Sequence, residues 1–178
     1  MNGAAQKPIE EANVWIRDSF DSEREWIIEL SPSAINDIEK AVDAAADAGH
    51  APQDLRPETF PLPRLKATLS DIYEIIENGR GFAVVRGWPS ERHNHQENLH
   101  AFCGIASYFG EAKVQNYEGE PIVDVIDKDK PYDHTSRGYM SNKRLPFHSD
   151  GADLVGLLCL GEPAEGGTSL LLSATHLY

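Results

Sequence analysis

The feature that most constrains the fold is a short apolar run near the end of the chain, Leu154–Leu160. Runs of this length and composition are typical of strands that are buried in a protein core. The run is followed by Gly161–Gly167, in which glycine, proline and glutamate indicate a turn. Thr168–Ser173 then predicts a second strand, so we expect a buried β-hairpin in this part of the chain.

A histidine and an aspartate two residues apart, His148 and Asp150, precede this apolar run. Alternate residues of an extended segment point to the same side, so we expect the imidazole and the carboxylate to project together. Two histidines and one carboxylate form the ligand set of non-haem iron(II) oxygenases, and this pair would supply two of those three ligands. The same spacing also suits a hydrogen-bonded His–Asp pair at the end of a strand.

The residues around this pair form a longer recognisable pattern. Residues 145–160 read L-P-F-H-S-D-G-A-D-L-V-G-L-L-C-L, and residues 161–171 read G-E-P-A-E-G-G-T-S-L-L. Together these segments resemble the taurine dioxygenase-like (TauD/TfdA) family of iron(II)/2-oxoglutarate-dependent dioxygenases. Residues 81–89, G-F-A-V-V-R-G-W-P, resemble the first core strand of that family. The resemblance covers roughly the chain from residue 81 onward.

The resemblance implies an α+β protein with a mostly β core, which is a partial double-stranded β-helix, or jelly roll. We expect residues 1–78 to form an N-terminal helical extension that packs on this core. Residues 79–178 would form the N-terminal part of the jelly-roll domain, without the strands that return to close it. The sequence accounts for about six strands, whereas a jelly roll has eight.

The resemblance also implies roles for individual residues. His148 and Asp150 correspond to iron(II) ligands, and Ser169 falls where the family has a threonine or serine that contacts 2-oxoglutarate. No catalytic residue is assigned beyond the metal ligands. Tyr139 and Asn142 approach the metal site along the chain and are candidates for the substrate pocket, although hydrogen bonds within their own loop would explain them equally well.

The implied reaction is hydroxylation or oxidative cleavage of a small organic substrate by molecular oxygen, coupled to decarboxylation of 2-oxoglutarate to succinate. In the family, a second histidine ligand and an arginine that pairs with 2-oxoglutarate lie far downstream, and this chain reaches Tyr178 without either. His176 would replace that histidine if the hairpin returned it beside Asp150, but the resemblance favours the downstream position.

We therefore expect a fragment with an incomplete iron site. Its unpaired strand edges and apolar faces would make it poorly soluble alone, or would pair with a second copy to form a homo-oligomer. Two other functions are compatible with the residues. One is a non-catalytic binding or interaction module on a degenerate dioxygenase scaffold, and the other is a hydrolase in which His148 is the general base and Asp150 its partner.

Amphipathic helices are expected to cover the sheet. Ser31 and Pro32 are typical of the first residues of a helix, and Gly49 of its end. A second apolar stripe predicts a helix over about Leu65–Asn78, and Ser90 would cap a third helix.

Short strands are also expected at residues 81–86, 114–116 and 121–127. Three histidines lie in or beside the third helix, and we interpret them as surface residues: His93, His95 and His100. Trp15 and Trp26 would pack on the core, although their rings could line a pocket.

The composition excludes several classes of partner. A net charge of −13 and a pI near 4.8 argue against nucleic acid or an anionic membrane surface as a partner. No apolar stretch is long enough to span a bilayer, and the first residues lack the apolar core of a signal peptide. Cys103 and Cys159 lie in apolar sequence, which predicts two buried, reduced thiols in a cytoplasmic protein.

Overall fold

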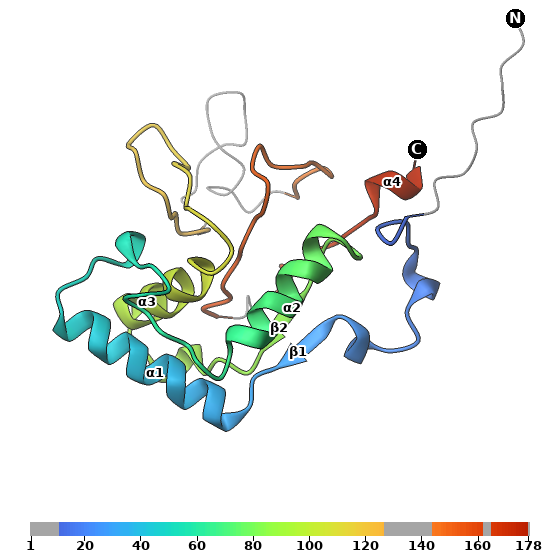
Figure 1. Ribbon diagram of the computed structural model, residues 1–178. Coiled ribbons are helices and arrows are strands. Elements are labelled where there is room, and N and C mark those ends of the chain that lie inside the picture. The colour runs from blue at the N-terminus through green and yellow to red at the C-terminus, as the bar shows by residue number, and fades with distance from the viewer. Residues whose placement is uncertain (1–10, 127–143, 162–164, 178) are drawn as a thin grey trace, which may run out of the picture. The chain divides into compact units, whose positions relative to one another are not determined.

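The computed structural model describes residues 11–126, 144–161 and 165–177 (Figure 1). Within these residues the helices and strands are β1 (Ile27–Glu29), α1 (Pro32–Asp47), α2 (Lys66–Glu77), β2 (Val84–Arg86), α3 (His95–Ala106) and α4 (Ala174–Leu177). Four 3-10 turns connect them: η1 (Arg17–Ser19), η2 (Glu23–Glu25), η3 (Pro52–Asp54) and η4 (Ser90–Arg92). The chain divides into two compact units. The first unit comprises Met1–Phe109 with Leu158–Tyr178, and the second comprises Gly110–Leu157.

Helix α1 forms where the sequence predicts it. The Ser31 hydroxyl accepts a hydrogen bond from the Ala34 N–H at 3.2 Å, and Pro32 occupies the first turn. Gly49, with a φ of 72°, follows the helix and adopts the left-handed conformation that glycine tolerates best. Small and branched apolar residues on one face are buried: Ala34, Ile38, Ala41, Val42 and Ala45.

Helix α1 packs against α3, and the connection through η3 lies on α3 as well (Figure 1). Phe60, in the loop before α2, is fully buried beside α3. A Cβ atom on Gly104 of α3 would lie only 2.4 Å from the Phe60 ring, so the absence of a side chain there lets the ring reach the helix backbone. The Tyr108 hydroxyl donates to the Phe60 carbonyl at 3.1 Å and fixes this loop.

Helix α3 begins later than the sequence predicts. Ser90 starts the 3-10 turn η4, and the cap of α3 is Asn94, whose side chain accepts from the Glu97 N–H at 3.0 Å. The Glu97 carboxylate accepts in turn from the Asn94 N–H at 2.9 Å, which completes a capping box. The reciprocal pair satisfies two backbone donors, whereas a serine four residues earlier can satisfy neither.

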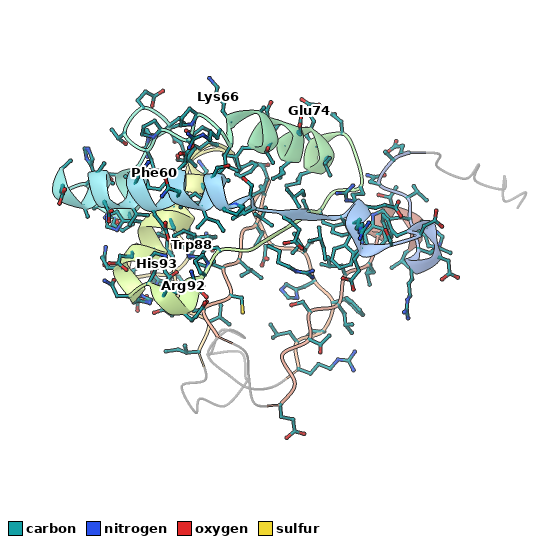
Figure 2. The ribbon with its side chains drawn as sticks, turned by 90° about the horizontal axis from the view of Figure 1, so that it is seen from below. Phe60, Lys66, Glu74, Trp88, Arg92 and His93 are labelled. Atoms are coloured by element: carbon teal, nitrogen blue, oxygen red, sulfur yellow. The ribbon has the colours of Figure 1, made fainter. Side chains whose placement is uncertain are left out.

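Two of the three histidines near α3 are more enclosed than expected. His100 is buried, with Nδ1 2.9 Å from the Gln96 carbonyl oxygen and Nε2 2.9 Å from that of His50. The prediction of a surface residue is therefore wrong for His100, because both ring nitrogens find backbone partners inside the helical packing. The His93 ring stacks on Trp88, with centroids 4.4 Å apart and an interplanar angle of 11° (Figure 2).

The sheet of the first unit consists of two parallel strands. Ile27 of β1 pairs with Val84 of β2, and Glu29 pairs with Arg86. Helices α1 and α2 occupy the chain between the strands, and a parallel pair needs a crossover of this kind. Around the start of this sheet lies a cluster of aromatic rings whose centroids are 5.0–6.2 Å apart: Trp15, Phe20, Trp26 and Phe82.

The expected jelly roll is not confirmed by this architecture. Only residues 84–86 of the predicted strand at 81–86 are in a strand, and the described parts of the four other predicted strands pair with nothing. Several apolar side chains of these segments are consequently exposed, including Leu157 at 77% and Leu171 at 63%. A strand is stable only when another strand completes its backbone hydrogen bonds, and in the described part of the chain no strand does so for these four segments. The domain boundary expected at residue 79 stays a prediction.

The two ends of the first unit are tied together. The Ser173 hydroxyl donates to the Asn13 carbonyl oxygen at 2.6 Å and accepts from the His176 N–H at 3.0 Å. Ser173 is buried, and it immediately precedes α4. One side chain therefore joins the N-terminal segment to the first turn of the last helix.

Candidate metal site

His148 and Asp150 lie side by side, as their spacing predicts. Their Nε2 and Oδ1 atoms are 3.8 Å apart, and the side chains are 52% and 56% exposed. Both groups belong to the second unit, in a segment without helix or paired strand. The two potential ligand atoms are thus adjacent and accessible from solvent.

The backbone sets the orientation of the imidazole ring. His148 Nδ1 lies 2.9 Å from the Pro146 carbonyl oxygen, which can only accept, so Nδ1 carries the proton of that hydrogen bond. In the neutral ring, Nε2 then presents its lone pair toward the Asp150 carboxylate. The 3.8 Å separation is too long for a hydrogen bond, so the pair is not the hydrogen-bonded His–Asp pair that its spacing also allowed.

These two groups suit a divalent metal ion. Histidines that bind metals commonly donate their other ring N–H to a backbone carbonyl, as His148 does to Pro146. A first-row metal ion bound by both atoms at about 2.1 Å separates them by about 3–4 Å, depending on the angle at the metal. The observed 3.8 Å lies at the wide end of this range, and ligation at a right angle, which gives about 3.0 Å, would require these exposed side chains to move closer together. An imidazole nitrogen and a carboxylate oxygen are also two of the three protein donors of non-haem iron(II) oxygenases.

Comparison with known proteins decides the family. The family model described as taurine catabolism dioxygenase TauD, TfdA family matches residues 47–178. The chain belongs to the TauD/TfdA family. The match includes the His148 and Asp150 segment and the three helices from α2 to α4, so the resemblance seen in the sequence motifs is confirmed.

Two relatives of this TauD/TfdA chain have names that describe enzymes. FR-33289 synthase of Streptomyces rubellomurinus is 31% identical over 175 residues, covering 97% of this chain and 52% of the relative. The taurine hydroxylase-like protein SAT17 of Stachybotrys chartarum is 32% identical over 172 residues, covering 92% of this chain and 45% of the relative. The chain therefore spans about half the length of the curated relatives it matches. Family membership supports an oxidoreductase of the dioxygenase type in general.

The structure does not test the other TauD/TfdA site residues expected from the sequence. Ser169 is exposed and belongs to the first unit, so its contact with 2-oxoglutarate stays a prediction. Tyr139 and Asn142 lie outside the described residues. His176 is exposed in α4, and among the described residues no group of three His, Cys, Asp or Glu side chains is placed to hold a metal ion.

Two further expectations concern the cysteines of this TauD/TfdA chain and membrane-spanning helices. Neither cysteine forms a disulfide; Cys103 is buried as predicted, whereas Cys159 is exposed, because the strand expected to bury it is not paired. No helix in the described part of the chain has the length and apolar character needed to cross a membrane.

Proposed function

We propose that this chain forms the part of an iron(II)/2-oxoglutarate-dependent dioxygenase that carries His148 and Asp150 as two of its iron ligands. The observation that carries the proposal is the 3.8 Å separation of Nε2 and Oδ1, in a segment that the family model covers. The substrate would be a small organic molecule, oxidised by molecular oxygen. The cytoplasmic location predicted from the sequence is kept as part of this proposal.

Each residue has a separate task in this proposal. Asp150 contributes a negative charge that offsets part of the charge of the cation. His148 contributes a neutral nitrogen whose direction is fixed by its hydrogen bond to the Pro146 carbonyl. The Ser169 hydroxyl would donate a hydrogen bond to the distal carboxylate of 2-oxoglutarate. When bound, the iron would supply the oxygen chemistry, in which 2-oxoglutarate is converted to succinate and carbon dioxide while the substrate is oxidised.

The ligand assignment is tested by iron(II) affinity under anaerobic conditions. We expect His148→Ala and Asp150→Asn each to weaken iron(II) binding by about tenfold or more, because affinity depends on the number of ligands. Asp153→Asn is the matched control, since Asp153 is an exposed carboxylate three residues away, and it should leave affinity unchanged. Equal iron(II) affinity in the unsubstituted chain and the His148→Ala variant would contradict the assignment.

The activity is tested separately by adding 2-oxoglutarate and oxygen to the iron-loaded chain. A weak visible charge-transfer band with 2-oxoglutarate, followed by release of succinate, would support a dioxygenase. Iron binding without either signal would show that these residues hold the ion without completing the reaction, as expected of a non-catalytic module or of an incomplete part of the enzyme. Turnover of an ester or amide without iron and oxygen would instead identify the hydrolase alternative.

A further inference from the structure

A partly open cavity of about 220 Å³ lies within the first unit, away from the residues of the proposed iron site in the sequence. Its wall combines one cation, two aromatic rings and two leucines: Arg80, Trp15, Phe82, Leu171 and Leu172. Drug-sized ligands occupy pockets of about 300–1,000 Å³, so a cavity of this size suits a smaller molecule. The mixture of one charge with apolar walls suits an amphipathic molecule.

Arg80 is held in place at this cavity. Its Nε donates to the Phe82 carbonyl oxygen at 3.0 Å, and its guanidinium carbon lies 5.7 Å from the centre of the Phe82 ring. The Trp15 indole N–H donates to the Arg80 carbonyl oxygen at 2.8 Å. The backbone and the Nε end of Arg80 are therefore positioned by the same two aromatic residues that line the cavity.

The other end of the guanidinium has no carboxylate within 4.0 Å among the described residues. Arg64 and Arg86, by contrast, each lie within 4.0 Å of a carboxylate. Partial burial lowers the pKa of Arg80, and the more distant charge of Glu25 only partly offsets this effect. A half-buried arginine without a carboxylate partner is a ready contact for an anion, because the guanidinium binds carboxylates through two parallel hydrogen bonds.

The apolar residues of the cavity wall indicate which kind of group the bound anion carries. Leu171 and Leu172 are 63% and 38% exposed, so an apolar ligand that covered them would remove apolar surface from water. The rings of Trp15 and Phe82 are tilted by 57° to each other, so they do not form two parallel faces between which a planar ring could stack. A short alkyl chain packs against tilted rings and leucines without such a constraint.

We propose that this cavity binds a short-chain aliphatic carboxylate, with the carboxylate on the free edge of Arg80 and the alkyl chain against Trp15, Phe82 and Leu172. The site is built from residues of the first unit only, and the proposal does not rest on the iron chemistry.

The proposal is tested with hexanoate, titrated into the complete chain by calorimetry. We expect saturable binding, and binding at least about tenfold weaker for hexanamide, which has the same chain without the charge. Acetate should also bind at least about tenfold more weakly, because it keeps the charge and lacks the apolar contact. Equal binding of acid and amide, or a signal that does not saturate, would overturn the proposal.

Arg80→Gln should weaken hexanoate binding by at least about tenfold while leaving the weak binding of hexanamide unchanged. The matched control is Arg92→Gln, which removes the same charge from an exposed arginine outside the cavity and should have no effect (Figure 2). If Arg80→Gln does not fold, Leu172→Asp places a negative charge on the exposed part of the wall instead and should abolish binding. Unchanged hexanoate affinity in a folded Arg80 or Leu172 variant would also overturn the proposal.

Discussion

The helical region around α1 and α3 and the segment 144–172 differ sharply in how far each is completed by its own residues. In the helical region, Ile38 and Phe60 are fully buried. In the described part of segment 144–172, most of the large apolar side chains are exposed. Both regions are rich in apolar residues, so composition does not explain the contrast.

The difference lies in where each region finds its backbone partners. A helix satisfies its N–H and C=O groups within four residues, so α1 and α3 need each other only to bury their apolar faces. A strand must find its partners in another segment. The apolar run Leu154–Leu160 has the composition of a buried strand, and no described segment pairs with it. Local sequence therefore suffices for the helices, whereas the strands depend on distant residues.

The largest expected difference in stability is between shortening a buried leucine in the helical region and shortening an exposed leucine in segment 144–172. Leu55→Ala should lower the free energy of unfolding by about 2–5 kcal/mol, because Leu55 is 2% exposed and its removal leaves a cavity. Leu157→Ala, at a position 77% exposed, should change it by less than about 0.5 kcal/mol. Urea unfolding followed by circular dichroism measures both. Similar losses in the two variants would mean that Leu157 is buried in solution and would break the contrast.

The two cysteines extend the comparison to chemical reactivity. Burial raises the pKa of the Cys103 thiol to about 11, so at pH 8 only about 0.1% of it is the reactive thiolate. Cys159 is exposed. The variants Cys103→Ser and Cys159→Ser each keep one cysteine. We expect Cys159 in the first variant to react with a disulfide reagent at least about 100-fold faster than Cys103 in the second.

The pH dependence of that reaction has a definite sign. Because the pKa of Cys103 is raised, its labelling rate should keep increasing as the pH rises toward about 11. A rate for Cys103 that levels off near pH 9 would show that the thiol is not held in an apolar environment.

A smaller effect is expected from adding one methyl group in each region. Gly104→Ala should lower the free energy of unfolding by about 1–3 kcal/mol, because the new Cβ would lie 2.4 Å from the buried Phe60 ring. Gly161→Ala is the matched change, since a Cβ there meets no atom within 4 Å. Thermal melting of both variants checks the result, and a stabilised Gly104→Ala variant would show that the Phe60 ring can move aside.

The sequence predicts the helices well because their signals are local. Ser31, Pro32 and Gly49 mark the ends of α1 within about one turn, and the stripe of α2 is recognisable from its own period. The predicted cap of α3 is wrong because two polar residues four apart, Ser90 and Asn94, both suit a helix start. Only the reciprocal contact with Glu97 distinguishes them, and the sequence S/T/D/N-x-x-E could have revealed it.

The sequence predicts those features of the candidate metal site that depend on neighbouring residues in the chain. The spacing of His148 and Asp150 predicts that their side chains lie close together, and the structure shows that they do. The hydrogen bond from the imidazole to the Pro146 carbonyl has no sequence signal, and neither has the burial of His100. The role of Ser169 depends on tertiary contacts, which local patterns do not specify. The cavity at Arg80 also escaped prediction, apart from the expectation that Trp15 could line a pocket.

The hydrogen bond from Ser173 to Asn13 joins residues 160 positions apart. Closing a loop of that length in a disordered chain costs about 4–5 kcal/mol of entropy, whereas one hydrogen bond returns only about 1 kcal/mol. The bond can therefore form only after the intervening helices have already brought the two segments together. We therefore expect this bond to form late in the folding of the first unit.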